Sequence, residues 1–491
     1  MNLELQDIAR AISAAPSTAN AVVSDYAIDS RAAGPGSLFF ALRGANSDGH
    51  LFVEAAFEQG AVAAVVERLG VGEHAPERGA DSQSAASRLV STQNERLGTS
   101  VEAAGKSACA TTAAQLVVPD VQVALEQLAG WARERWARPV VGITGSAGKT
   151  TTKEVIARLL AVEMGVGKTE GNLNNHIGVP LSILRLPDAA QVAVIEIGMN
   201  HAGEIRQLAA IARPTVGVVT NVGFAHAEFF RSADEVALAK RELIEALPAD
   251  GTAVLNADDP RVARFSDGFA GRVVTYGLAE GADVRAEAVE CGPDGVRFRV
   301  DGTDFESSFV GRHGVMNILA GLAVARVFSI APARLVDAVR ALQAVRMRGE
   351  RFVHGGATIL NDCYNSNPEA VRAMLDVLRA MPARRRIAVL GEMLELGDWS
   401  ETSHRGVGSY AVKCGIEVLV GIRGAARQMI DEAIRSGLSA SAAVFFDDPE
   451  SAGEFLRGMV EPGDAVLFKG SRGTHVERAL EKLTGPVAVN S

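Results

Sequence analysis

A glycine-rich run at residues 142–150, Gly-Ile-Thr-Gly-Ser-Ala-Gly-Lys-Thr, is the segment of this chain best suited to chemistry. It follows the apolar residues 139–141 and precedes a helix-like stretch at residues 151–160. A strand, a glycine-rich turn and a helix start present backbone N–H groups to phosphate oxygens. Lys149 would add a positive charge beside the β- and γ-phosphates, and the Thr150 hydroxyl would coordinate Mg²⁺. The run therefore predicts a loop that binds ATP or GTP.

The loop departs from the general phosphate-loop spacing at one position. That spacing requires glycine at position 143, whereas this chain has Ile143 and places Gly142 one residue early. A chance glycine-rich turn is the alternative at this point. If the loop binds a nucleotide, the contacts come from one consecutive set of residues: Gly145, Ser146, Ala147, Gly148, Lys149, Thr150 and Thr151.

One carboxylate lies near the end of the apolar run at residues 192–197. A buried charge costs several kcal/mol unless it is paired or bound to a metal. Beside a phosphate loop, Glu196 is therefore a candidate Mg²⁺ ligand. The alternative is a carboxylate that emerges into solvent where the strand ends, and the residues alone favour neither.

Two further side chains have the position or the type to act near a nucleotide. His226 follows the apolar run at residues 216–220, on the ligand side of a parallel sheet, although a single histidine is more often structural. Lys240 lies in a helical stretch at residues 235–242, where a surface lysine paired with glutamate is the ordinary interpretation.

A polar, glycine-flanked segment at residues 171–180 leads into a helix that ends near Leu186. The side chains of Asn172, Asn174 and Asn175 give this segment a dense hydrogen-bonding surface that suits a substrate. An asparagine-rich turn is the alternative.

These candidates follow apolar runs, as expected where the strands of a parallel sheet end. In the middle of the chain such runs alternate with helical stretches, which predicts a mostly parallel sheet with helices on both faces. The runs are residues 192–197, 216–220, 252–256 and 273–276, and a helix at residues 120–136 precedes the loop. Short alternating runs over residues 282–309 predict antiparallel strands beside that sheet.

A second alternating series begins after Arg348 and predicts a doubly wound, Rossmann-like domain. Its strand-like runs are residues 358–360, 387–390, 418–420, 443–446 and 465–468. Strand-like runs at residues 37–42 and 61–67 with a helix at 52–59 predict a small N-terminal α/β domain, and residues 73–113 predict a flexible insertion. We therefore expect three α/β domains, over residues 1–118, 119–346 and 347–491.

Composition narrows the class of protein. A net charge of −10 offers no basic excess for nucleic acid. The four cysteines are far apart, which fits a reducing cytosol and neither a disulfide framework nor a zinc ribbon. Residues 1–13 suggest a surface helix rather than a signal peptide, and no apolar run is long enough to span a membrane.

Taken together, these motifs resemble the Mur ligase family in their order along the chain. The phosphate loop of that family, matched by residues 144–150, lacks the first glycine of the general spacing, which accounts for Ile143. Residues 311–317 resemble its adenine-side motif, with Gly314 where asparagine is more usual. The other matching segments are residues 29–31, 36–42, 48–50, 172–175, 196, 226, 240, 256–259, 348–349 and 361–368.

Within the family, two segments are most similar to the member that adds D-alanyl-D-alanine to UDP-N-acetylmuramoyl-tripeptide. They are Tyr-Asn-Ser-Asn-Pro at residues 364–368 and Leu-Gly-Glu-Met-Leu-Glu-Leu-Gly at residues 390–397. The chain has no Asp-Asn-Pro-Arg motif, which the diaminopimelate-adding relative carries. The resemblance thus implies an ATP-dependent peptide ligase of peptidoglycan synthesis that works through an acyl phosphate.

The resemblance also implies roles for single residues. Lys149, Lys240 and His226 would be catalytic, and two Mg²⁺ ions would be held by Thr150, Glu196, His226 and Lys240. The matching lysine of the family is carbamylated, so we expect Lys240 to become a carboxylate-like ligand. Asn317 would contact the adenine, Arg348 the phosphates and Asp362 the ribose. The expected substrate contacts are Ser30, Asn172, Asn174, Asn175, Tyr364 and Asn365.

Two kinds of alternative remain open. One is a related ligase that adds diaminopimelate or lysine, or glutamate to folate as folylpolyglutamate synthase does. The other is a nucleotide-dependent binding module that makes no amide bond. In either of the ligase interpretations we expect a cytoplasmic monomer that has no nucleic-acid partner and does not insert into a membrane.

Overall fold

The computed structural model describes residues 1–15, 19–44, 47–69, 114–223 and 227–485. The chain divides into two compact units. The first comprises residues 1–138, 172–190 and 210–212, and the second comprises residues 139–171, 191–209 and 213–491. Each unit is described below by itself.

The first unit contains a four-stranded sheet in the order β3-β4-β5-β6, with all neighbours parallel. The strands are β3 (Asp25–Ala27), β4 (Ser37–Phe40), β5 (Ala63–Val66) and β6 (Ala114–Val117). Apolar side chains of β4 and β5 pack against α2 (Val53–Glu58), as the sequence predicts. The helix α3 (Val121–Trp136) begins where the Asp120 side chain accepts a hydrogen bond from the Val123 N–H, at 2.9 Å.

The chain start differs from the single helix expected over residues 1–13. A short strand, β1 (Leu3–Glu4), pairs antiparallel with β2 (Val22–Val23), and α1 (Leu5–Ala11) follows it. The helix is shorter than predicted because residues 3–4 pair in β1 instead. Its apolar face packs into the fold, where Leu5 and Ile8 are fully buried. The predicted insertion at residues 73–113 lies outside the described residues.

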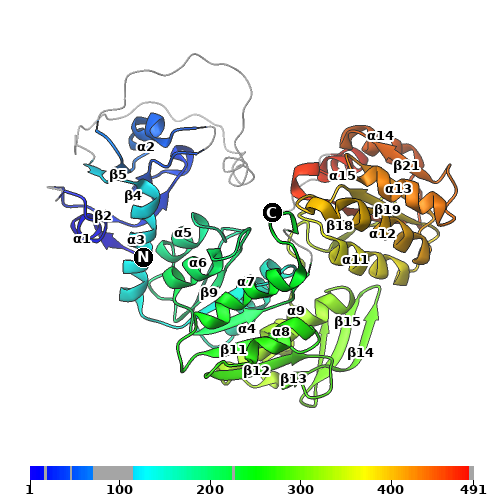
Figure 1. Ribbon diagram of the computed structural model, residues 1–491, viewed down its shortest axis with the longest axis horizontal. Helices are drawn as coiled ribbons and strands as arrows, with labels where there is room; N and C mark the ends of the chain where they lie inside the picture. The colour runs from blue at the N-terminus through cyan, green and yellow to red at the C-terminus, as the bar shows by residue number, and fades with distance from the viewer. Residues whose placement is uncertain (16–18, 45–46, 70–113, 224–226, 486–491) are drawn as a thin grey trace. The chain divides into compact units, whose positions relative to one another are not determined.

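The second unit contains a seven-stranded parallel sheet in the order β13-β12-β11-β10-β7-β9-β8. The strands are β7 (Val140–Thr144), β8 (Val166–Lys168), β9 (Val192–Glu196), β10 (Val216–Val219), β11 (Thr252–Asn256), β12 (Arg272–Gly277) and β13 (Val284–Arg285). Its helices are α4 (Lys149–Leu160), α6 (Glu204–Ala212), α7 (Ala233–Glu245), α8 (Pro260–Ala263), α9 (Gly311–Val327) and α10 (Val336–Arg340) (Figure 1). The predicted parallel sheet is confirmed.

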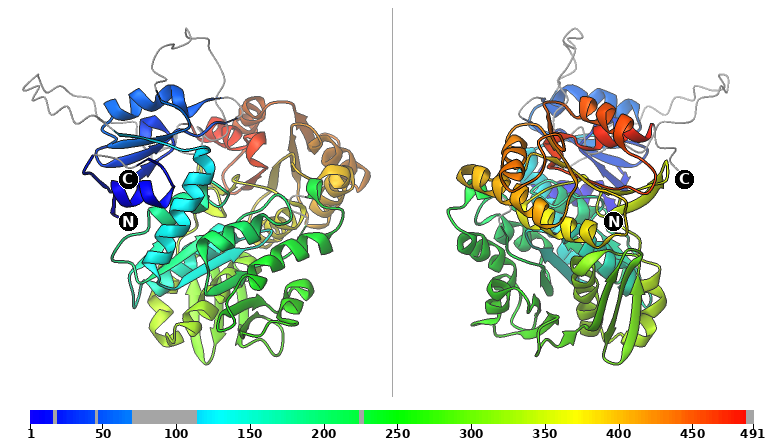
Figure 2. Two further views of the ribbon diagram at one scale, coloured as in Figure 1. Left: turned by 60° about the vertical axis from the view of Figure 1, so that its left-hand side comes forward. Right: turned by 90° about the vertical axis from the view of Figure 1, so that its right-hand side faces the viewer.

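A small antiparallel sheet, β14 (Glu287–Gly292), β15 (Gly295–Val300) and β16 (Thr303–Ser307), packs beside α9 (Figure 2). Alternate residues of β15, Val296, Phe298 and Val300, are buried, and the arginines between them are exposed. This period of two is the pattern from which the sequence predicts antiparallel strands in this region.

A six-stranded sheet, also in the second unit and called the third sheet below, has the order β17-β18-β22-β19-β20-β21. The strands are β17 (Glu350–His354), β18 (Ala357–Asp362), β19 (Arg386–Gly391), β20 (Val418–Ile422), β21 (Ala443–Phe446) and β22 (Ala465–Lys469). All pairs are parallel except β17 with β18. Its helices are α11 (Pro368–Ala380), α12 (Ser400–Lys413), α13 (Ala426–Arg435), α14 (Pro449–Met459) and α15 (Glu477–Thr484).

Two separate cores cover the faces of this sheet. In β19, Ala388 and Leu390 join a core with α11, α12 and α13, whereas Ile387 and Val389 join a core with α14 and α15. Figure 1 shows α11 and α14 on opposite sides of the sheet. Because both faces are buried, the strands have apolar runs rather than alternation. The predicted doubly wound arrangement is confirmed.

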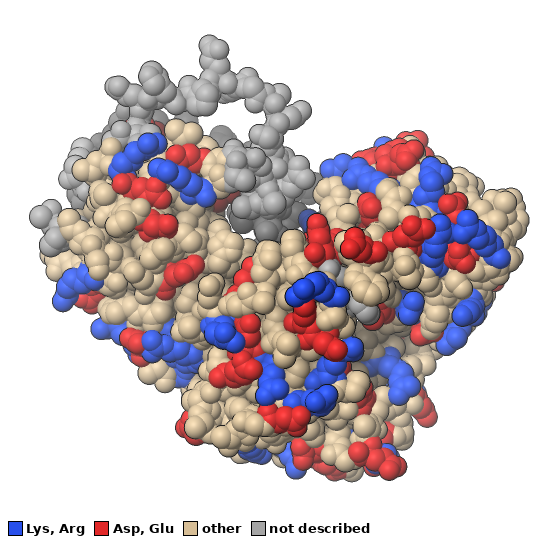
Figure 3. Space-filling model, in the orientation of Figure 1, with Lys and Arg blue, Asp and Glu red and all other residues tan. Residues whose placement is uncertain are grey.

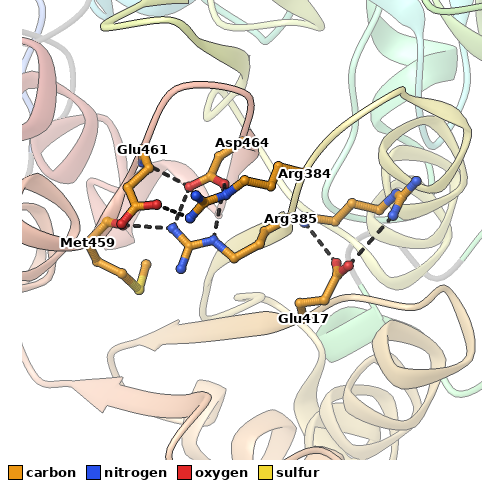
Figure 4. Close-up of polar contacts among 7 residues, drawn as sticks. Arg384, Arg385, Glu417, Met459, Glu461 and Asp464 are labelled. Carbon is orange, nitrogen blue, oxygen red and sulfur yellow. Dashed lines mark hydrogen bonds and ion pairs between the residues drawn. The ribbon is translucent and has the colours of Figure 1, made fainter.

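Three consecutive arginines at the start of β19 are engaged in ion pairs (Figure 4). Arg385 forms a bidentate pair with Asp464, whose side chain is fully buried, with N–O distances of 2.6 and 3.1 Å. Arg384 contacts Glu461, and the Arg386 guanidinium lies 3.8 Å from Glu417. These contacts join the amino-terminal ends of neighbouring strands and are structural rather than phosphate-binding.

Charge is mixed over the visible surface. Outside the grey atoms, Figure 3 shows Lys and Arg interspersed with Asp and Glu. Within the described ranges, none of the helices combines the length and the apolar composition that a bilayer crossing requires. The α/β fold class, with three sheets that each carry helices, agrees with the prediction. The domain boundaries at residues 118 and 346 stay predictions.

Candidate active site

The loop between β7 and α4 has a backbone that only glycine tolerates at two positions. Gly145 has φ +151° and Gly148 has φ +81°. A Cβ at Gly145 would lie 1.8 Å from the Thr220 hydroxyl, and one at Gly148 would lie 2.7 Å from Asn317 Oδ1. The loop therefore lies tightly between β10 and α9, which the chance-turn alternative does not explain.

The end of β10 holds this loop through a network centred on Asn221. Its carbonyl accepts the Ser146 N–H at 3.0 Å, and its side-chain amide exchanges two hydrogen bonds with the Ala147 backbone, at 2.9 and 3.0 Å. Ser146 Oγ is also bonded to the Gly223 backbone. Two of the loop N–H groups expected to face phosphates thus donate to Asn221. The first N–H groups of α4, which have no partners within the helix, remain the phosphate-facing set.

Lys149 begins α4 and folds back over the loop. Its Nζ donates to the Gly145 carbonyl at 2.7 Å. Burial lowers the pKa of Lys149; the Glu196 carboxylate opposes this and the Arg348 guanidinium adds to it. Lys149 and Arg348 therefore bring positive charge to the same place, as triphosphate binding requires.

Thr150 and Glu196 meet at the base of the loop. The Thr150 hydroxyl donates to Glu196 Oε2 at 2.8 Å, and both residues are buried. The Glu196 N–H is bonded to Thr169 Oγ1 at 3.1 Å, which fixes the end of β9. A hydroxyl and a carboxylate are hard oxygen ligands that suit Mg²⁺, with phosphates and water completing its shell. Burial excludes the solvent-exposed alternative for Glu196.

A second lysine of α4, which the sequence prediction missed, lies beside Glu196. Lys153 is fully buried, and its Nζ donates to the Gly171 carbonyl at 2.7 Å. The same Nζ lies 3.3 Å from Glu154 Oε1 and 4.0 Å from Glu196 Oε2. Its spacing in the sequence indicates this position, because Lys153 follows Thr150 by one helical turn and so lies on the same face of α4.

Lys240 is buried in α7 and is not a surface residue. Its exposed fraction is 1%. Burial, with the positive charge of Lys149 as a second cause, lowers the pKa of Lys240 well below the usual lysine value. Within the described chain, no hydrogen bond or ion pair involves its Nζ. The signal in the sequence is its helical neighbours Val236, Leu243 and Ile244, which are buried on the same face.

The metal-binding set predicted from the sequence is only partly visible. His226 lies outside the described residues. Among the residues that are described, no three His, Cys, Asp or Glu side chains form a group able to hold a metal. The ligand pair Thr150 and Glu196 is brought together, and Lys240 and Lys149 are close enough to interact electrostatically.

Asn317 contacts the other side of the phosphate loop. Its Oδ1 accepts from Thr152 Oγ1 at 3.1 Å and lies against Gly148. Asn317 is carried by α9, which packs on α4 through apolar residues of both helices. A nucleotide bound at the loop would therefore lie near this side chain. Thr151 lies in the first turn of α4 and is half-buried.

The third sheet contributes a stacked pair and a buried ion pair. The Arg348 guanidinium lies 3.7 Å from the Tyr364 ring centroid, a cation–π contact. Burial raises the pKa of Tyr364, so its hydroxyl remains protonated. Lys469 Nζ donates to Asp362 Oδ2 at 2.6 Å and to the Asn365 carbonyl at 2.9 Å. Asp362 thus ends β18 as the partner of a buried lysine at the end of β22.

Four of the six residues expected to bind substrate belong to the first unit. Asn175 Oδ1 accepts the N–H groups of Ile177 and Gly178, at 3.2 and 2.8 Å, just before α5 (Gly178–Leu184). Ser30 is buried at the start of a short 3-10 helix. Asn172 and Asn174 form a tight turn, with the Asn174 N–H bonded to the Asn172 carbonyl at 2.8 Å. The turn-forming alternative thus describes part of this segment.

Known families match three regions of the chain. The model of the Mur ligase family, catalytic domain, matches residues 23–129. The Mur ligase middle domain matches residues 143–325, and the Mur ligase glutamate ligase domain matches residues 346–472.

Similar proteins extend this match over nearly the full length. The chain is 34% identical over 463 residues to the UDP-N-acetylmuramoyl-tripeptide–D-alanyl-D-alanine ligase of Synechocystis sp., covering 94% of this chain and 92% of that protein. The structure of MurF from Acinetobacter baumannii has a TM-score of 0.82 and 28% identity and covers 99% of both chains. The structure of the MurF ligase from Thermotoga maritima in complex with ADP has a TM-score of 0.77 and 27% identity, and covers 94% and 98%. The phosphate loop, the sheet orders and these similarities agree, and the chain belongs to the Mur ligase family.

Proposed function

We propose that this chain joins D-alanyl-D-alanine to UDP-N-acetylmuramoyl-tripeptide in an ATP-dependent reaction of peptidoglycan synthesis. The observation that carries the proposal is the similarity to a curated ligase of that name over 94% of the chain. The site supports it, because the phosphate loop, Thr150, Glu196 and Arg348 form the cationic, oxygen-lined environment that a triphosphate needs. The related structure of a MurF ligase in complex with ADP supports the binding of an adenine nucleotide by this chain.

The reaction must bring two anions together. The terminal carboxylate of the tripeptide attacks the γ-phosphate of ATP, which releases ADP and leaves an acyl phosphate. The amine of D-alanyl-D-alanine then attacks the acyl carbon, a tetrahedral intermediate forms, and it collapses to the amide, inorganic phosphate and a proton. Lys149, whose Nζ is bonded to the loop carbonyl at Gly145, would move to the phosphates and neutralise charge in the transition state.

Mg²⁺ would supply further shielding of the phosphate charges, and Thr150 and Glu196 fit the role of its protein ligands. For a second ion we propose His226 and a carbamylated Lys240. Burial lowers the pKa of this amine, which has no partner in the described chain, and so favours the uncharged form that reacts with CO₂. Carbamylation would replace this costly buried amine by an anion that a metal can pair with.

The remaining contacts are proposed on position. Asn317 would contact the adenine, Arg348 the phosphates and Asp362, held by Lys469, the ribose. For the substrates we propose Tyr364 and Asn365 in the third sheet, and, in the first unit, Ser30, Asn172, Asn174 and Asn175. A monomeric state and a cytoplasmic location belong to the same proposal, and sedimentation of the purified chain tests the first.

The test is mass analysis of the product formed from ATP, Mg²⁺, UDP-N-acetylmuramoyl-tripeptide and D-alanyl-D-alanine. The expected product is the pentapeptide, with one phosphate released per amide. Lys149→Ala should form none, and Lys240→Ala should be inactive but partly restored by acetate. Amide formation with diaminopimelate, lysine or folate and glutamate instead would favour a related ligase. Bound ATP without any amide would favour a binding module.

A further inference from the structure

Lys153 is a buried ionisable group beside the phosphate loop that the reaction outlined above does not use. Its side chain has no exposed surface, although lysine normally keeps its ammonium in water. It lies on α4 one turn after Thr150, which places both side chains on the helix face toward β9. A lysine in this position must have charge partners to offset its loss of hydration.

The charge partners of Lys153 include the carboxylate proposed to hold Mg²⁺. Lys153 Nζ lies 4.0 Å from Glu196 Oε2, the same oxygen that accepts the Thr150 hydroxyl at 2.8 Å. A positive charge and a hydroxyl donor therefore converge on one carboxylate oxygen. In the nucleotide-free protein the negative charge of Glu196 is already balanced from within the fold.

The ammonium is also fixed in place. Its short hydrogen bond to the Gly171 carbonyl, 2.7 Å, and its pair with Glu154 at 3.3 Å hold Nζ from two further sides. Glu154 in turn contacts Lys168, which is 42% exposed. Among these four groups, two carboxylates and two ammonium groups, the charges cancel, so a lone divalent cation would meet a carboxylate that already has a positive partner.

We propose that Lys153 is an internal counter-ion that withholds Glu196 from free Mg²⁺, so that the metal enters only together with the nucleotide. The phosphates bring several negative charges, and these outweigh the repulsion between Mg²⁺ and the ammonium. Mg²⁺ is generally held by one or two carboxylates plus substrate phosphates, which fits a site that is incomplete by itself. The proposal rests on the proposed function, because it takes Glu196 as a Mg²⁺ ligand. Lys153 itself is a positioning residue, since it acts through Glu196.

The test is binding of Mn²⁺, as a paramagnetic substitute for Mg²⁺, to the full chain without nucleotide, followed by electron paramagnetic resonance of the free ion. Lys153→Gln keeps a donor for the Gly171 carbonyl but removes the charge. We expect it to bind Mn²⁺ about tenfold tighter than the wild type or more. The matched control is Lys168→Gln, which removes the same charge beside Glu154 from an exposed position and should change the affinity less than about twofold. Adding Glu196→Gln to Lys153→Gln should abolish the gain.

Two results would overturn the proposal, and a third concerns only the proposed function. A folded Lys153→Gln protein, judged by its melting temperature, that binds Mn²⁺ no tighter than the wild type would overturn the proposal. A wild type that binds Mn²⁺ tightly without nucleotide, and loses that binding in Glu196→Gln, would overturn it even if Lys153→Gln does not fold. Failure of the proposed function is distinct, because the wild type would then form no pentapeptide whatever its Mn²⁺ binding.

Discussion

Replacing Lys240 by methionine should stabilise the nucleotide-free protein while it abolishes ligation. The lysine is 1% exposed and has no charge partner in the described chain, and burial lowers its pKa well below the usual value. Methionine has a similar unbranched side chain and no amine, so it fills the same space without a group that needs hydration. The two effects are opposite in sign because the amine is unfavourable for folding and, as proposed, necessary for the metal site.

The magnitude depends on pH. Since the folded-state pKa of Lys240 lies below the unfolded-state value, folding expels a proton. The free-energy cost of removing this proton on folding is absent above about pH 10.4, the ordinary lysine pKa. It grows by about 1.4 kcal/mol for each pH unit below that value, until the folded-state pKa is reached. At about pH 8.5 the ceiling is therefore about 3 kcal/mol. For a domain of roughly 200 residues this corresponds to about 6–12 °C in melting temperature.

The assay is thermal unfolding of wild type and Lys240→Met, without nucleotide and under CO₂-free gas, at several pH values between about 7.5 and 10. The advantage of the variant should shrink as pH rises. Bicarbonate with Mg²⁺, added at constant pH and ionic strength, should raise the melting temperature of the wild type alone. Lys168→Met, an exposed lysine, serves as the control and should change stability by less than about 0.5 kcal/mol. A variant less stable than the wild type at every pH would refute the reasoning.

Three other substitutions test the loop and the third sheet. Gly145→Ala would force a Cβ to within 1.8 Å of a hydroxyl, so affinity for an ATP analogue should fall at least about 30-fold; Gly130→Ala, which meets nothing within 4 Å, should leave it unchanged in calorimetry. Asn221→Ala removes the two side-chain hydrogen bonds to the loop, at about 1 kcal/mol each, so the same affinity should fall by about tenfold or more; an unchanged value would show that the loop holds its shape alone. Arg385→Met leaves the buried Asp464 carboxylate without its bidentate partner and should cost about 3 kcal/mol in urea unfolding, and Arg385→Met with Asp464→Leu should recover most of it.

The strands of the two large sheets could be predicted because most are buried on both faces. β11 is found at residues 252–256 as predicted, and β9 and β10 differ from the prediction by one residue. Three short or exposed strands were not predicted as they are found. β13 (Val284–Arg285) lies within the region expected to hold antiparallel strands, yet it pairs parallel with β12 in the seven-stranded sheet. β8 has three residues, of which only Gly167 is buried, and β17 alternates half-buried with exposed residues at a sheet edge. Neither β8 nor β17 leaves a run of apolar residues from which a strand could be predicted.

At the site, the position of a residue could be predicted where it follows from neighbouring residues and could not where it depends on the fold. The phosphate loop and the carboxylate of Glu196 could be located from local patterns. The burial of Lys240 and Lys153 was not predicted from the residues alone, because a lysine in a helix is normally exposed. The role of Asn221 depends on β10 and β7 being neighbours, a pairing that joins residues far apart in the chain.

Strand β22 carries ion pairs at both ends. Asp464, just before its first residue, accepts hydrogen bonds from Arg385, and Lys469, its last residue, donates one to Asp362. Five residues of extended chain separate these pairs by about 17 Å. An engineer can therefore vary the chain around Asp362 and Lys469 and leave untouched the residues that secure the opposite end of the sheet. Activity could then be changed by substitutions at one end of β22 and stability by substitutions at the other.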